Sequence, residues 1–480
     1  MKTYQLYING KWQDAVNGEL KNVYSPINED LIAKIQDGDE ADAIKALTAA
    51  ESAHGEWSLL PARKRAEILR RFVSLIRNKR ADLANLLVKE QGKLHRVAEM
   101  EVDVTCSFIE YACDWARHLE GNIIPSDNKN EHIYIHKVSR GVVVAITAWN
   151  FPLALAARKI GPALVTGNTV VLKPTSETPL ATLELADLAK EAGMPDGVLN
   201  IVTGSGRKLG DALCRNNITK MITMTGSTPA GQAILNAATE TMAHVQLELG
   251  GKAPFIVMED ADLEAAAVAA LHSRFDNCGQ VCTCNERLYV QSSVYDQFMK
   301  IFLPMVENLT VGDPMDADTD IGPKINKAEV EHMHELVDES VRQGATIACG
   351  GKKPEGDLFE KGFWFEPTIL TDVTQEMEIV HEESFGPILP VIKFDDKEQV
   401  IRYANDADYG LAAMVFTKDM NYVHQLVNAL EAGEVYINRG HGEQHQGFHN
   451  GLKLSGTGGE DGRYGIEQYM EKKTFYINYS

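Results

Sequence analysis

A cysteine in a glycine-containing loop is the clearest candidate nucleophile in the sequence. Cys282 lies in the segment NCGQVCTCNER, shortly after Gly279. A cysteine reacts as its thiolate and needs a positive field or backbone donors to ionise, and glycine lets backbone amides approach a reacting atom. A buried structural cysteine and a metal ligand are the alternatives. The C-x3-C-x-C spacing disfavours metal, because no histidine or paired CxxC completes a tetrahedral site.

Two further side chains suit the acid–base and electrostatic steps that a thiol nucleophile requires. Glu248 closes the apolar run HVQLEL before a Gly-Gly pair, and a carboxylate at such a strand end suits a general base whose pKa is raised by desolvation. Asn150 follows the run GVVVAIT, and its amide could donate to a developing oxyanion together with the Cys282 backbone N–H. The alternatives are a solvated glutamate and an Asx turn.

The cofactor signals are individually weak. Lys173 ends the run TVVLK and could hold a ribose or a phosphate, although a solvated lysine is the alternative. In TGSTPAG, Gly226 and Ser227 precede a helix start, where amides and the helix dipole can hold a pyrophosphate; a plain helix cap is the alternative. No GxGxxG fingerprint is present. The nearest match, around Gly206, has the wrong last spacing.

The elements that must position these residues form an α/β pattern. The first 120 residues predict helices, and from residue 141 short β-branched runs alternate with amphipathic stretches. Such alternation predicts βαβ units in a doubly wound parallel sheet, with ligands beyond the carboxyl ends of the strands. A second alternating series begins near Gly250. The ribbon Asn122–Lys137 and the closing strand KTFYINYS fit neither series and could pair with another subunit.

The bulk composition narrows the class of protein. The 480 residues, 44% of them hydrophobic, indicate two or three domains. The net charge of -21 argues against nucleic-acid binding, which requires a basic footprint. The N-terminus lacks the apolar stretch of a secretory signal, and the most apolar segment, 142–157, is too interrupted to span a membrane. Seven thinly spread cysteines are not a disulfide framework, so we expect a cytoplasmic protein.

Together these motifs resemble the aldehyde dehydrogenase superfamily over nearly the whole chain. The matching stretches are AWNFP, GPALVTGNTVVLKP, GVLNIVTG, TGSTPAG, LELGGKAPFIV, GQVCTCNERLYV, EESFGPI, YGLAA and KLSGTGGEDG. The resemblance implies an α/β fold with two doubly wound domains and a small β oligomerisation arm. We expect a Rossmann-like dinucleotide domain over 1–120 and 140–249, a catalytic domain over 250–450, and the arm over 121–139 and 459–480. A homo-oligomer, dimer or tetramer, follows from that arm.

The resemblance also assigns roles to single residues. Cys282 matches the nucleophile that forms a thiohemiacetal and then a thioester, Asn150 the oxyanion donor, and Glu248 the base that activates the hydrolytic water. No metal is implied. Glu383 and Phe385 match the residues that position the nicotinamide ribose and ring. The full cofactor set is Trp149, Lys173, Ser176, Gly206, Gly226, Ser227, Glu383 and Phe385.

Cofactor choice departs from the NAD-selective pattern. Those family members usually carry a glutamate three residues after the lysine, which bonds the ribose 2′-hydroxyl. Here that place is Ser176, and Glu177 comes one residue late. A serine does not repel a 2′-phosphate, and Lys173 could pair with it. We predict that NADP is accepted and could be preferred, with NAD as the alternative if Glu177 swings in.

The substrate prediction depends on the C-terminal third of the chain. The stretch YINRGHGEQHQGFHNGLKLSG resembles the lactaldehyde/glycolaldehyde dehydrogenase branch, and there Arg158 and His449 would bind the hydroxyl and the product carboxylate of a short hydroxyaldehyde. However, an arginine at the Arg158 place and the stretch KPTSETP also resemble succinate-semialdehyde dehydrogenases, and Arg158 could simply bond helix-end carbonyls. We favour the hydroxyaldehyde.

Two other kinds of protein share the fold and are disfavoured. CoA-acylating or phosphorylating members have no need for a hydrolytic base such as Glu248. A non-catalytic structural member has no need for the intact set of Cys282, Glu248 and Asn150. Nothing in the sequence supports a nucleic-acid or membrane partner.

Overall fold

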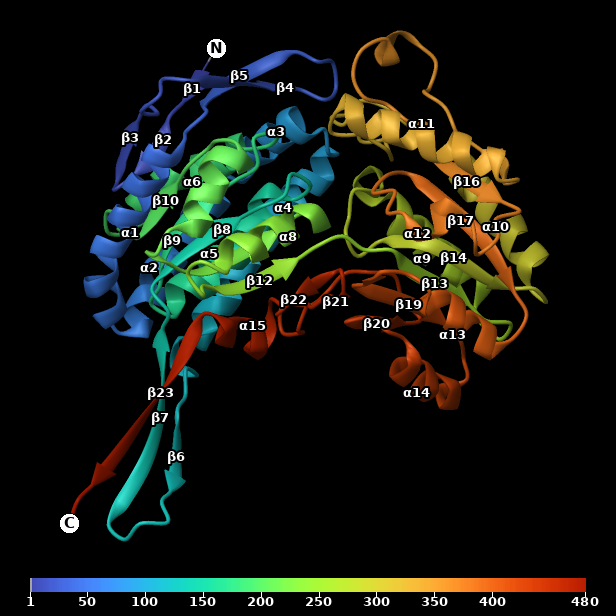
Figure 1. The fold of residues 1–480 in the computed structure, drawn as a ribbon. Helices are drawn as coiled ribbons and strands as arrows, with labels where there is room; N and C mark the ends of the chain where they lie inside the picture. Colours follow the sequence, from blue (N-terminus) through green and yellow to red (C-terminus); the bar gives the residue numbers. More distant parts are fainter. Residues whose placement is uncertain (1) are drawn as a thin grey trace.

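The computed structural model describes residues 2–480, which form two α/β lobes and a projecting β arm (Figure 1). The first lobe is built on an eight-stranded sheet in the order β22-β12-β11-β8-β9-β10-β2-β3. Its five central strands, from β12 to β10, run parallel, and the edge strands pair antiparallel. The strands are β2 (Leu6–Ile8), β3 (Lys11–Gln13), β8 (Val142–Ile146), β9 (Thr169–Lys173), β10 (Leu199–Ile201), β11 (Thr219–Thr225), β12 (His244–Glu248) and β22 (Gly456–Thr457).

Helices cover both faces of this sheet because its central strands are apolar on both sides. In β8, Val143 and Ala145 pack into one core with α4, α5 and α6, whereas Val142 and Val144 pack into a second core with α1 and α7. The helices are α1 (Glu40–Leu59), α2 (Ala62–Asn78), α3 (Arg80–Gln91), α4 (His95–Asp114), α5 (Pro152–Val165), α6 (Leu180–Glu191), α7 (Asp211–Arg215), α8 (Thr228–Ala238) and α15 (Gly462–Gln468).

The second lobe repeats the design with a seven-stranded sheet in the order β15-β16-β17-β14-β13-β19-β20. All neighbours are parallel except the β15–β16 pair. Its strands are β13 (Ala253–Val257), β14 (Asn285–Gln291), β15 (Thr346–Cys349), β16 (Thr368–Thr371), β17 (Ile388–Phe394), β19 (Ala412–Phe416) and β20 (Glu434–Ile437). Its helices are α9 (Leu263–Phe275), α10 (Tyr295–Glu307), α11 (Lys327–Arg342), α12 (Glu378–His381), α13 (Lys397–Asn405) and α14 (Met420–Ala429).

The chain passes from one lobe to the other between β12, which ends at Glu248, and β13, which begins at Ala253. It returns near residue 456, where β22 pairs with β12. Two small sheets complete the lobes: β1 (Lys2–Tyr4), β5 (Leu31–Gln36) and β4 (Leu20–Tyr24), and the pair β18 (Tyr409–Gly410) with β21 (Leu452–Lys453).

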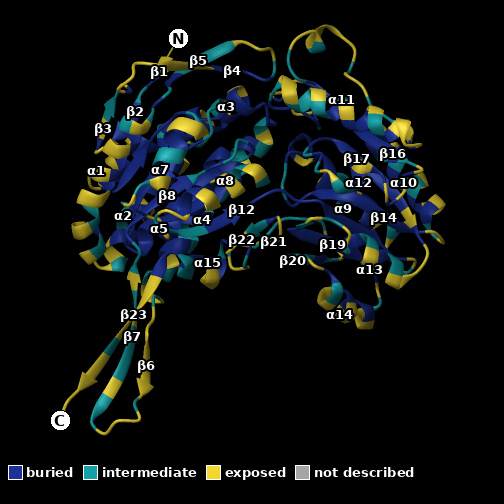
Figure 2. Ribbon diagram, in the orientation of Figure 1, coloured by how far each residue is buried: buried dark blue, intermediate teal, exposed yellow. Residues whose placement is uncertain are grey.

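The arm is an antiparallel sheet of β6 (Asn122–Pro125), β7 (Glu131–Ser139) and β23 (Met470–Asn478). It extends away from the first lobe and is mostly exposed or half-buried, whereas both large sheets are buried (Figures 1 and 2). Helix α15 packs against α5, so only β23 of the C-terminal segment lies in the arm.

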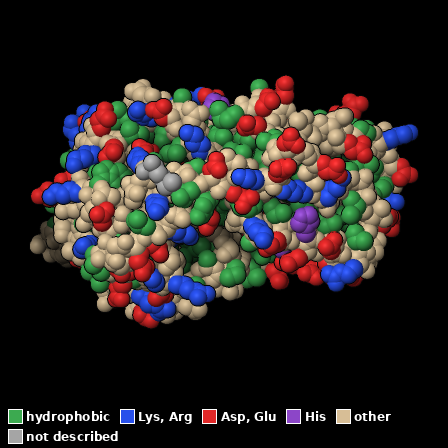
Figure 3. Space-filling view, turned by 90° about the horizontal axis from the view of Figure 1, so that it is seen from above, with side chains coloured by type: hydrophobic (Ala, Val, Ile, Leu, Met, Phe, Trp, Pro, Cys, Tyr) green, Lys and Arg blue, Asp and Glu red, His purple; other side chains and the backbone are tan. Residues whose placement is uncertain are grey.

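The α/β class predicted from the sequence is confirmed by these two sheets. Among residues 2–480, no helix is long and apolar enough to cross a membrane. On the face seen in Figure 3, acidic and basic side chains are intermingled, without an extended basic region. That face therefore has no footprint of the kind that nucleic-acid binding requires.

Candidate active site

The nucleophile loop connects α9 to β14 through a backbone that few residues adopt. Asn277, Cys278 and Gly279 all have positive φ, at 48°, 58° and 71°. A Cβ at Gly279 would lie 2.3 Å from the main-chain oxygen of Gly386, so only glycine fits there. The two non-glycine residues cost about 1–3 kcal/mol each, which the surrounding packing must offset. This turn places Cys282 in a partly exposed position, while Cys278 and Cys284 are buried.

Asn150, the predicted oxyanion donor, contacts this loop. It follows β8, and its Nδ2 donates to the main-chain oxygen of Gln280 at 3.1 Å, two residues before Cys282. Its Oδ1 has no hydrogen-bond partner. Nδ2 carries two N–H groups and donates this one hydrogen bond, so its second N–H remains available to an oxygen near Cys282.

Glu248 is the last residue of β12 and is buried, with its side chain 4% exposed. Neither carboxylate oxygen accepts a hydrogen bond from a backbone amide or hydroxyl, and the nearest cation is His449, whose Nε2 lies 3.2 Å from Oε2. Burial raises the pKa of Glu248, and His449 acts against that rise. A raised pKa makes the carboxylate a stronger base, which suits the predicted role.

His449 lies between two carboxylates. Its Nε2 lies 3.2 Å from Oε2 of Glu248, and its Nδ1 lies 2.9 Å from Oε2 of Glu434. Burial alone disfavours the imidazolium, but Glu248 raises the pKa of His449 well above its usual value. Glu434 was not predicted from the sequence. It begins β20, whereas ligands were expected beyond the carboxyl ends of the strands.

Arg158, on the fully buried helix α5, is already paired. Its Nε donates to Asp461 at 3.0 Å, its Nη2 lies 2.9 Å from Glu443, and the guanidinium lies over the ring of Phe108. Burial works against the charged form of Glu443, but Arg158 lowers the pKa of that carboxyl to about 2. The two acidic partners were not singled out in the sequence, although both lie in the stretches that carried the resemblance.

Lys173 marks the cofactor side of the first sheet. It is the last residue of β9, is buried, and makes no hydrogen bond or ion pair with another described side chain. Burial, reinforced by Lys21, lowers the pKa of Lys173 to about 8. A buried ammonium without a partner favours an anionic or hydroxyl ligand. Ser176 is half-buried nearby, and Glu177 turns to Lys21 at 3.7 Å.

The predicted pyrophosphate turn also has free donors. Ser227 is the N-cap of α8, but its side chain makes no capping hydrogen bond. A Cβ at Gly226 would lie 2.4 Å from Met224 Cε, the end of a flexible side chain, so a larger residue would displace that methionine. Gly206 begins a short helical turn, Gly206–Gly210, and a Cβ there would meet no other atom. The open N-terminus of α8 can therefore hold an anion.

The nicotinamide residues come from both lobes. Trp149, after β8, makes an edge contact with Phe385 at 5.3 Å between ring centroids. Glu383 accepts from the Gly251 amide at 2.7 Å, and burial raises its pKa to about 7. The amides of Ser384 and Phe385 donate to the buried carboxylate of Glu286, which fixes this segment. These residues, with Lys173 and α8, fit a dinucleotide spanning both lobes.

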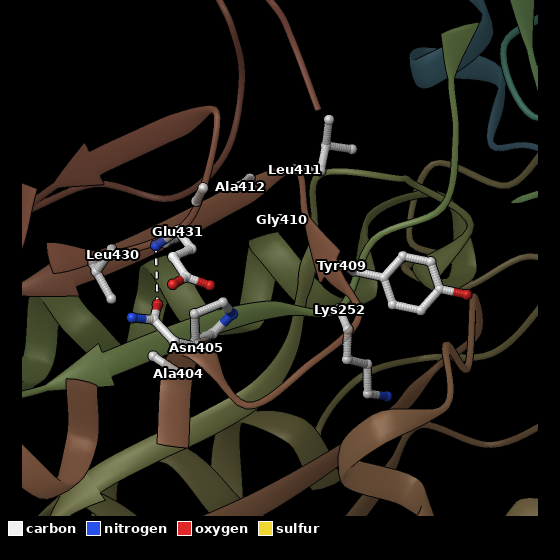
Figure 4. Close-up of a pocket in the computed structure, with 12 residues that line it drawn as sticks. Lys252, Ala404, Asn405, Tyr409, Gly410, Leu411, Ala412, Leu430 and Glu431 are labelled. Atoms are coloured by element: carbon white, nitrogen blue, oxygen red, sulfur yellow. Dashed lines mark hydrogen bonds between the residues drawn. The ribbon is translucent and has the colours of Figure 1, made fainter. Parts of the chain in front are cut away.

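A small cavity elsewhere in the second lobe does not belong to this site. It lies between Asn405, Glu431 and Tyr409 (Figure 4) and contains none of the predicted catalytic residues. Asn405 accepts a hydrogen bond from the Glu431 amide at 2.9 Å, and the Lys252 side chain points away from that pair. Lys252 instead pairs with Glu286.

Comparisons with known proteins agree with this geometry. The model of the aldehyde dehydrogenase family matches residues 12–475. Over 479 residues the chain is 66% identical to 3,6-anhydro-alpha-L-galactose dehydrogenase of Vibrio sp. (strain EJY3), covering 100% of both chains. It is 44% identical over 475 residues to lactaldehyde dehydrogenase of Escherichia coli (strain K12), covering 99% and 98%. A solved structure of 3,6-anhydro-L-galactose dehydrogenase in complex with NADP superimposes with a TM-score of 0.98 at 68% identity, covering 99% and 100%.

Proposed function

Given that the chain belongs to the aldehyde dehydrogenase family, we propose that its substrate is a hydroxylated aldehyde, with 3,6-anhydro-L-galactose as the first candidate. The chain is an NAD(P)-dependent aldehyde dehydrogenase, as the resemblance implied. The sequence favoured lactaldehyde or glycolaldehyde. Because the 66% identical relative is named for a larger hydroxyaldehyde, the small aldehydes become the second candidates.

The observation that supports this substrate class is the pairing of Arg158. Its charge is balanced by Asp461 and Glu443, so the distal carboxylate of succinate semialdehyde would have to displace a buried partner. A neutral, hydroxylated aldehyde needs only donors and acceptors. Glu443, the partner of Arg158, and His449, the partner of Glu248, would supply an acceptor and a donor.

The chain's own residues can carry the covalent chemistry. The Cys282 sulfur attacks the aldehyde carbon, and the thiohemiacetal oxyanion is held by Asn150 Nδ2 and the Cys282 amide. The nicotinamide, when bound, accepts hydride, which leaves a thioester on Cys282. Glu248 then takes a proton from a water that attacks the thioester carbon; the C–S bond breaks and the carboxylic acid departs.

We propose that NADP is accepted alongside NAD. Lys173 has no acidic partner, and Glu177 pairs with Lys21 rather than with Lys173. A 2′-phosphate would gain an ion pair with Lys173 and meet Ser176 instead of a carboxylate.

We also propose that the arm pairs with a second copy of the chain. Its strands expose large apolar side chains, with Ile123 67% exposed and Tyr476 68% exposed. Exposed apolar edge strands tend to pair with strands of another chain. Light scattering should give a dimer or tetramer, and deletion of residues 124–136 should give smaller particles. The cytoplasmic location remains a prediction from the sequence.

A substrate panel tests the proposed function. The purified chain is mixed with 3,6-anhydro-L-galactose, L-lactaldehyde, glycolaldehyde, succinate semialdehyde and an unsubstituted aldehyde, each with NAD and with NADP. Reduced nicotinamide is followed by absorbance, with Cys282→Ala as the blank. The proposal requires the highest kcat/KM with a hydroxyaldehyde. If succinate semialdehyde is preferred, Arg158 is a carboxylate anchor despite its pairing.

A further inference from the structure

Glu286, near the start of β14, bonds to groups from three other parts of the second lobe. Its side chain is 2% exposed, and its carboxylate accepts from Arg274 Nη1 and from Lys252 Nζ, each at 2.7 Å. The same carboxylate accepts from the main-chain amides of Ser384 and Phe385, at 2.9 and 3.1 Å, and from the Ser384 hydroxyl at 2.7 Å. Hydrogen bonds to a buried charged group are among the stronger ones in a protein, so these groups are held together.

Arg274 connects the Glu286 carboxylate to the nucleophile loop. It lies in the last turn of α9, and its side chain has no exposed surface. Its Nη2 donates to the main-chain oxygen of Gly279 at 2.8 Å, and its Nη1 donates to that of Asn285 at 2.8 Å. Gly279 and Asn285 lie three residues before and three residues after Cys282. Arg274 therefore holds the loop on both sides of the proposed nucleophile.

The nicotinamide segment is held from the opposite side of the same carboxylate. Ser384 and Phe385 bond to Glu286 directly. Lys252, which also bonds to Glu286, follows Gly251, whose amide donates to Glu383 at 2.7 Å. The two loops also touch, because a Cβ at Gly279 would lie 2.3 Å from the main-chain oxygen of Gly386. The segment that contains Phe385 and the loop that contains Cys282 thus share one buried anion.

We propose that Glu286 is a positioning residue that holds the nucleophile loop, residues 276–284, and the nicotinamide segment, residues 383–386, at a fixed separation for hydride transfer. The inference rests on the proposed function, because it takes Cys282 as the nucleophile and Phe385 as a nicotinamide contact. Hydride transfer requires the thiohemiacetal carbon to face the nicotinamide closely, and a misplacement of about 1 Å lowers the rate of an enzyme by about 10²-fold.

A carboxylate suits this place because every group around it is a donor. Burial works against the charged form of Glu286, but Arg274 and Lys252 lower its pKa to about 2. An ionised carboxylate has two acceptor oxygens, whereas a glutamine has one acceptor oxygen and an NH2 group that would face a donor. Glu286→Gln therefore keeps the size of the side chain and removes half of its acceptors.

The competing interpretation is a structural ion cluster, in which Glu286 only neutralises two buried cations. Loss of such a cluster lowers the fraction of folded enzyme, but it leaves the rate constant of the enzyme that remains folded unchanged. The two interpretations therefore differ in a single-turnover rate constant measured with enzyme in excess over aldehyde, because that constant belongs to the folded enzyme alone.

The variants are Glu286→Gln and Ser384→Ala, which removes one hydroxyl donor and leaves both ion pairs in place. Glu467→Gln is the matched control, because it makes the same change at a carboxylate that also pairs with one lysine and one arginine, Lys137 and Arg463, outside the site. Thermal unfolding confirms that each variant is folded.

Two measurements are made on each variant. Stopped-flow absorbance follows reduced cofactor in a single turnover at saturating NADP, with the aldehyde that the parent oxidises at the highest kcat/KM and with the same aldehyde deuterated at its carbonyl carbon. Hydrogen–deuterium exchange, without aldehyde or cofactor, follows the main-chain amides of residues 276–284 and 383–386.

We expect Glu286→Gln to lower the single-turnover rate constant at least about tenfold, with a further fall for the deuterated aldehyde because hydride transfer is the slowed step. Both segments should exchange faster than in the parent. Ser384→Ala should change the rate constant in the same direction but less, and Glu467→Gln should match the parent in both measurements.

An unchanged rate constant in folded Glu286→Gln would overturn the inference, as would a fall without an isotope effect or an equal fall in Glu467→Gln. Faster exchange in only one segment, or in neither, would show that Glu286 does not hold the two together. If Glu286→Gln does not fold, the same outcomes are read from Ser384→Ala. If the parent oxidises no aldehyde, the proposed function fails, whereas the exchange measurement still tests whether Glu286 holds both segments.

Discussion

The ammonium of Lys93 donates to the main-chain oxygen of Asn150 at 2.7 Å. The Lys93 side chain has no solvent-exposed surface. Lys93 also pairs with Glu101, whose carboxylate accepts from the Leu153 amide at the start of α5, at 2.8 Å. One buried ion pair therefore holds the segment that carries the proposed oxyanion donor. The segment after α3 therefore contacts the residue that is proposed to hold the oxyanion at Cys282.

Lys93→Met should lower both activity and stability. It leaves Glu101 buried without its cation, which costs about 3–5 kcal/mol of unfolding free energy, and it releases the Asn150 carbonyl. We expect kcat to fall at least tenfold, on the order of the effect of misplaced catalytic groups. Urea unfolding and steady-state kinetics measure the two effects. Lys89→Met is the control, because Lys89 is exposed on α3, which ends two residues before Lys93. An equal loss in Lys89→Met would contradict a specific role for Lys93.

Asn150→Ala should act on the reaction rather than on cofactor binding. Loss of one oxyanion donor lowers kcat by about 10²–10³-fold in other enzymes, and all the proposed cofactor residues except Trp149 lie on other segments. We therefore expect a fall of that order in kcat, with the KM for NADP within about twofold of the parent. If kcat is unchanged while the KM for NADP rises, Asn150 binds cofactor instead.

Much of this site could be predicted because each residue follows its strand directly. Asn150 comes after β8, Lys173 ends β9 and Glu248 ends β12, and the parallel arrangement brings these ends to one edge. Residues that act through tertiary contacts could not be predicted. Lys93 lies 57 residues from the Asn150 carbonyl that it contacts, and Glu434 lies 15 residues from His449. Nothing in the local sequence of either residue distinguishes it from a surface charge.

The fold was predicted well in type and less well at its edges. Helices were predicted in the first 120 residues without their ends, and α1 continues through Gly55 to Leu59. Its last turn buries Trp57, whose Nε1 donates to the Leu164 carbonyl at 3.2 Å. The expected arm segment 459–480 also includes α15. That helix packs against α5 of the first lobe, and its own sequence does not reveal this tertiary contact.

The affinity for NADP should depend on pH through Lys173. Its pKa is lowered to about 8, so the cationic form predominates below that pH and is lost above it. We expect the KM for NADP to rise as pH increases from 8 to 9.5, while the KM for NAD changes less, because NAD has no 2′-phosphate. Lys173→Met should raise the KM for NADP and flatten its pH dependence. Parallel changes for both cofactors would place the titrating group elsewhere.

Arg158→Met should destabilise the chain strongly. It leaves Asp461 and Glu443 buried without their cation, a change that costs about 3–5 kcal/mol. We expect the urea midpoint to fall with an unchanged m-value. Arg463→Met is the matched control, since Arg463 is 57% exposed and pairs only with Glu467 on its own helix. An undisturbed midpoint in Arg158→Met would mean that these carboxylates are not dependent on Arg158, and the argument against a distal substrate carboxylate would fail.

Trapping the acyl-enzyme tests directly whether the reaction passes through a thioester on Cys282. Glu248→Gln is mixed with NADP and 3,6-anhydro-L-galactose or L-lactaldehyde, quenched in acid, and analysed by intact-protein and peptide mass spectrometry. Without the hydrolytic base, the thioester should accumulate. We expect one acyl group per chain, on Cys282, with one equivalent of reduced cofactor. Reduced cofactor with no acyl group on Cys282, or with the acyl group on another residue, would contradict a thioester mechanism at Cys282.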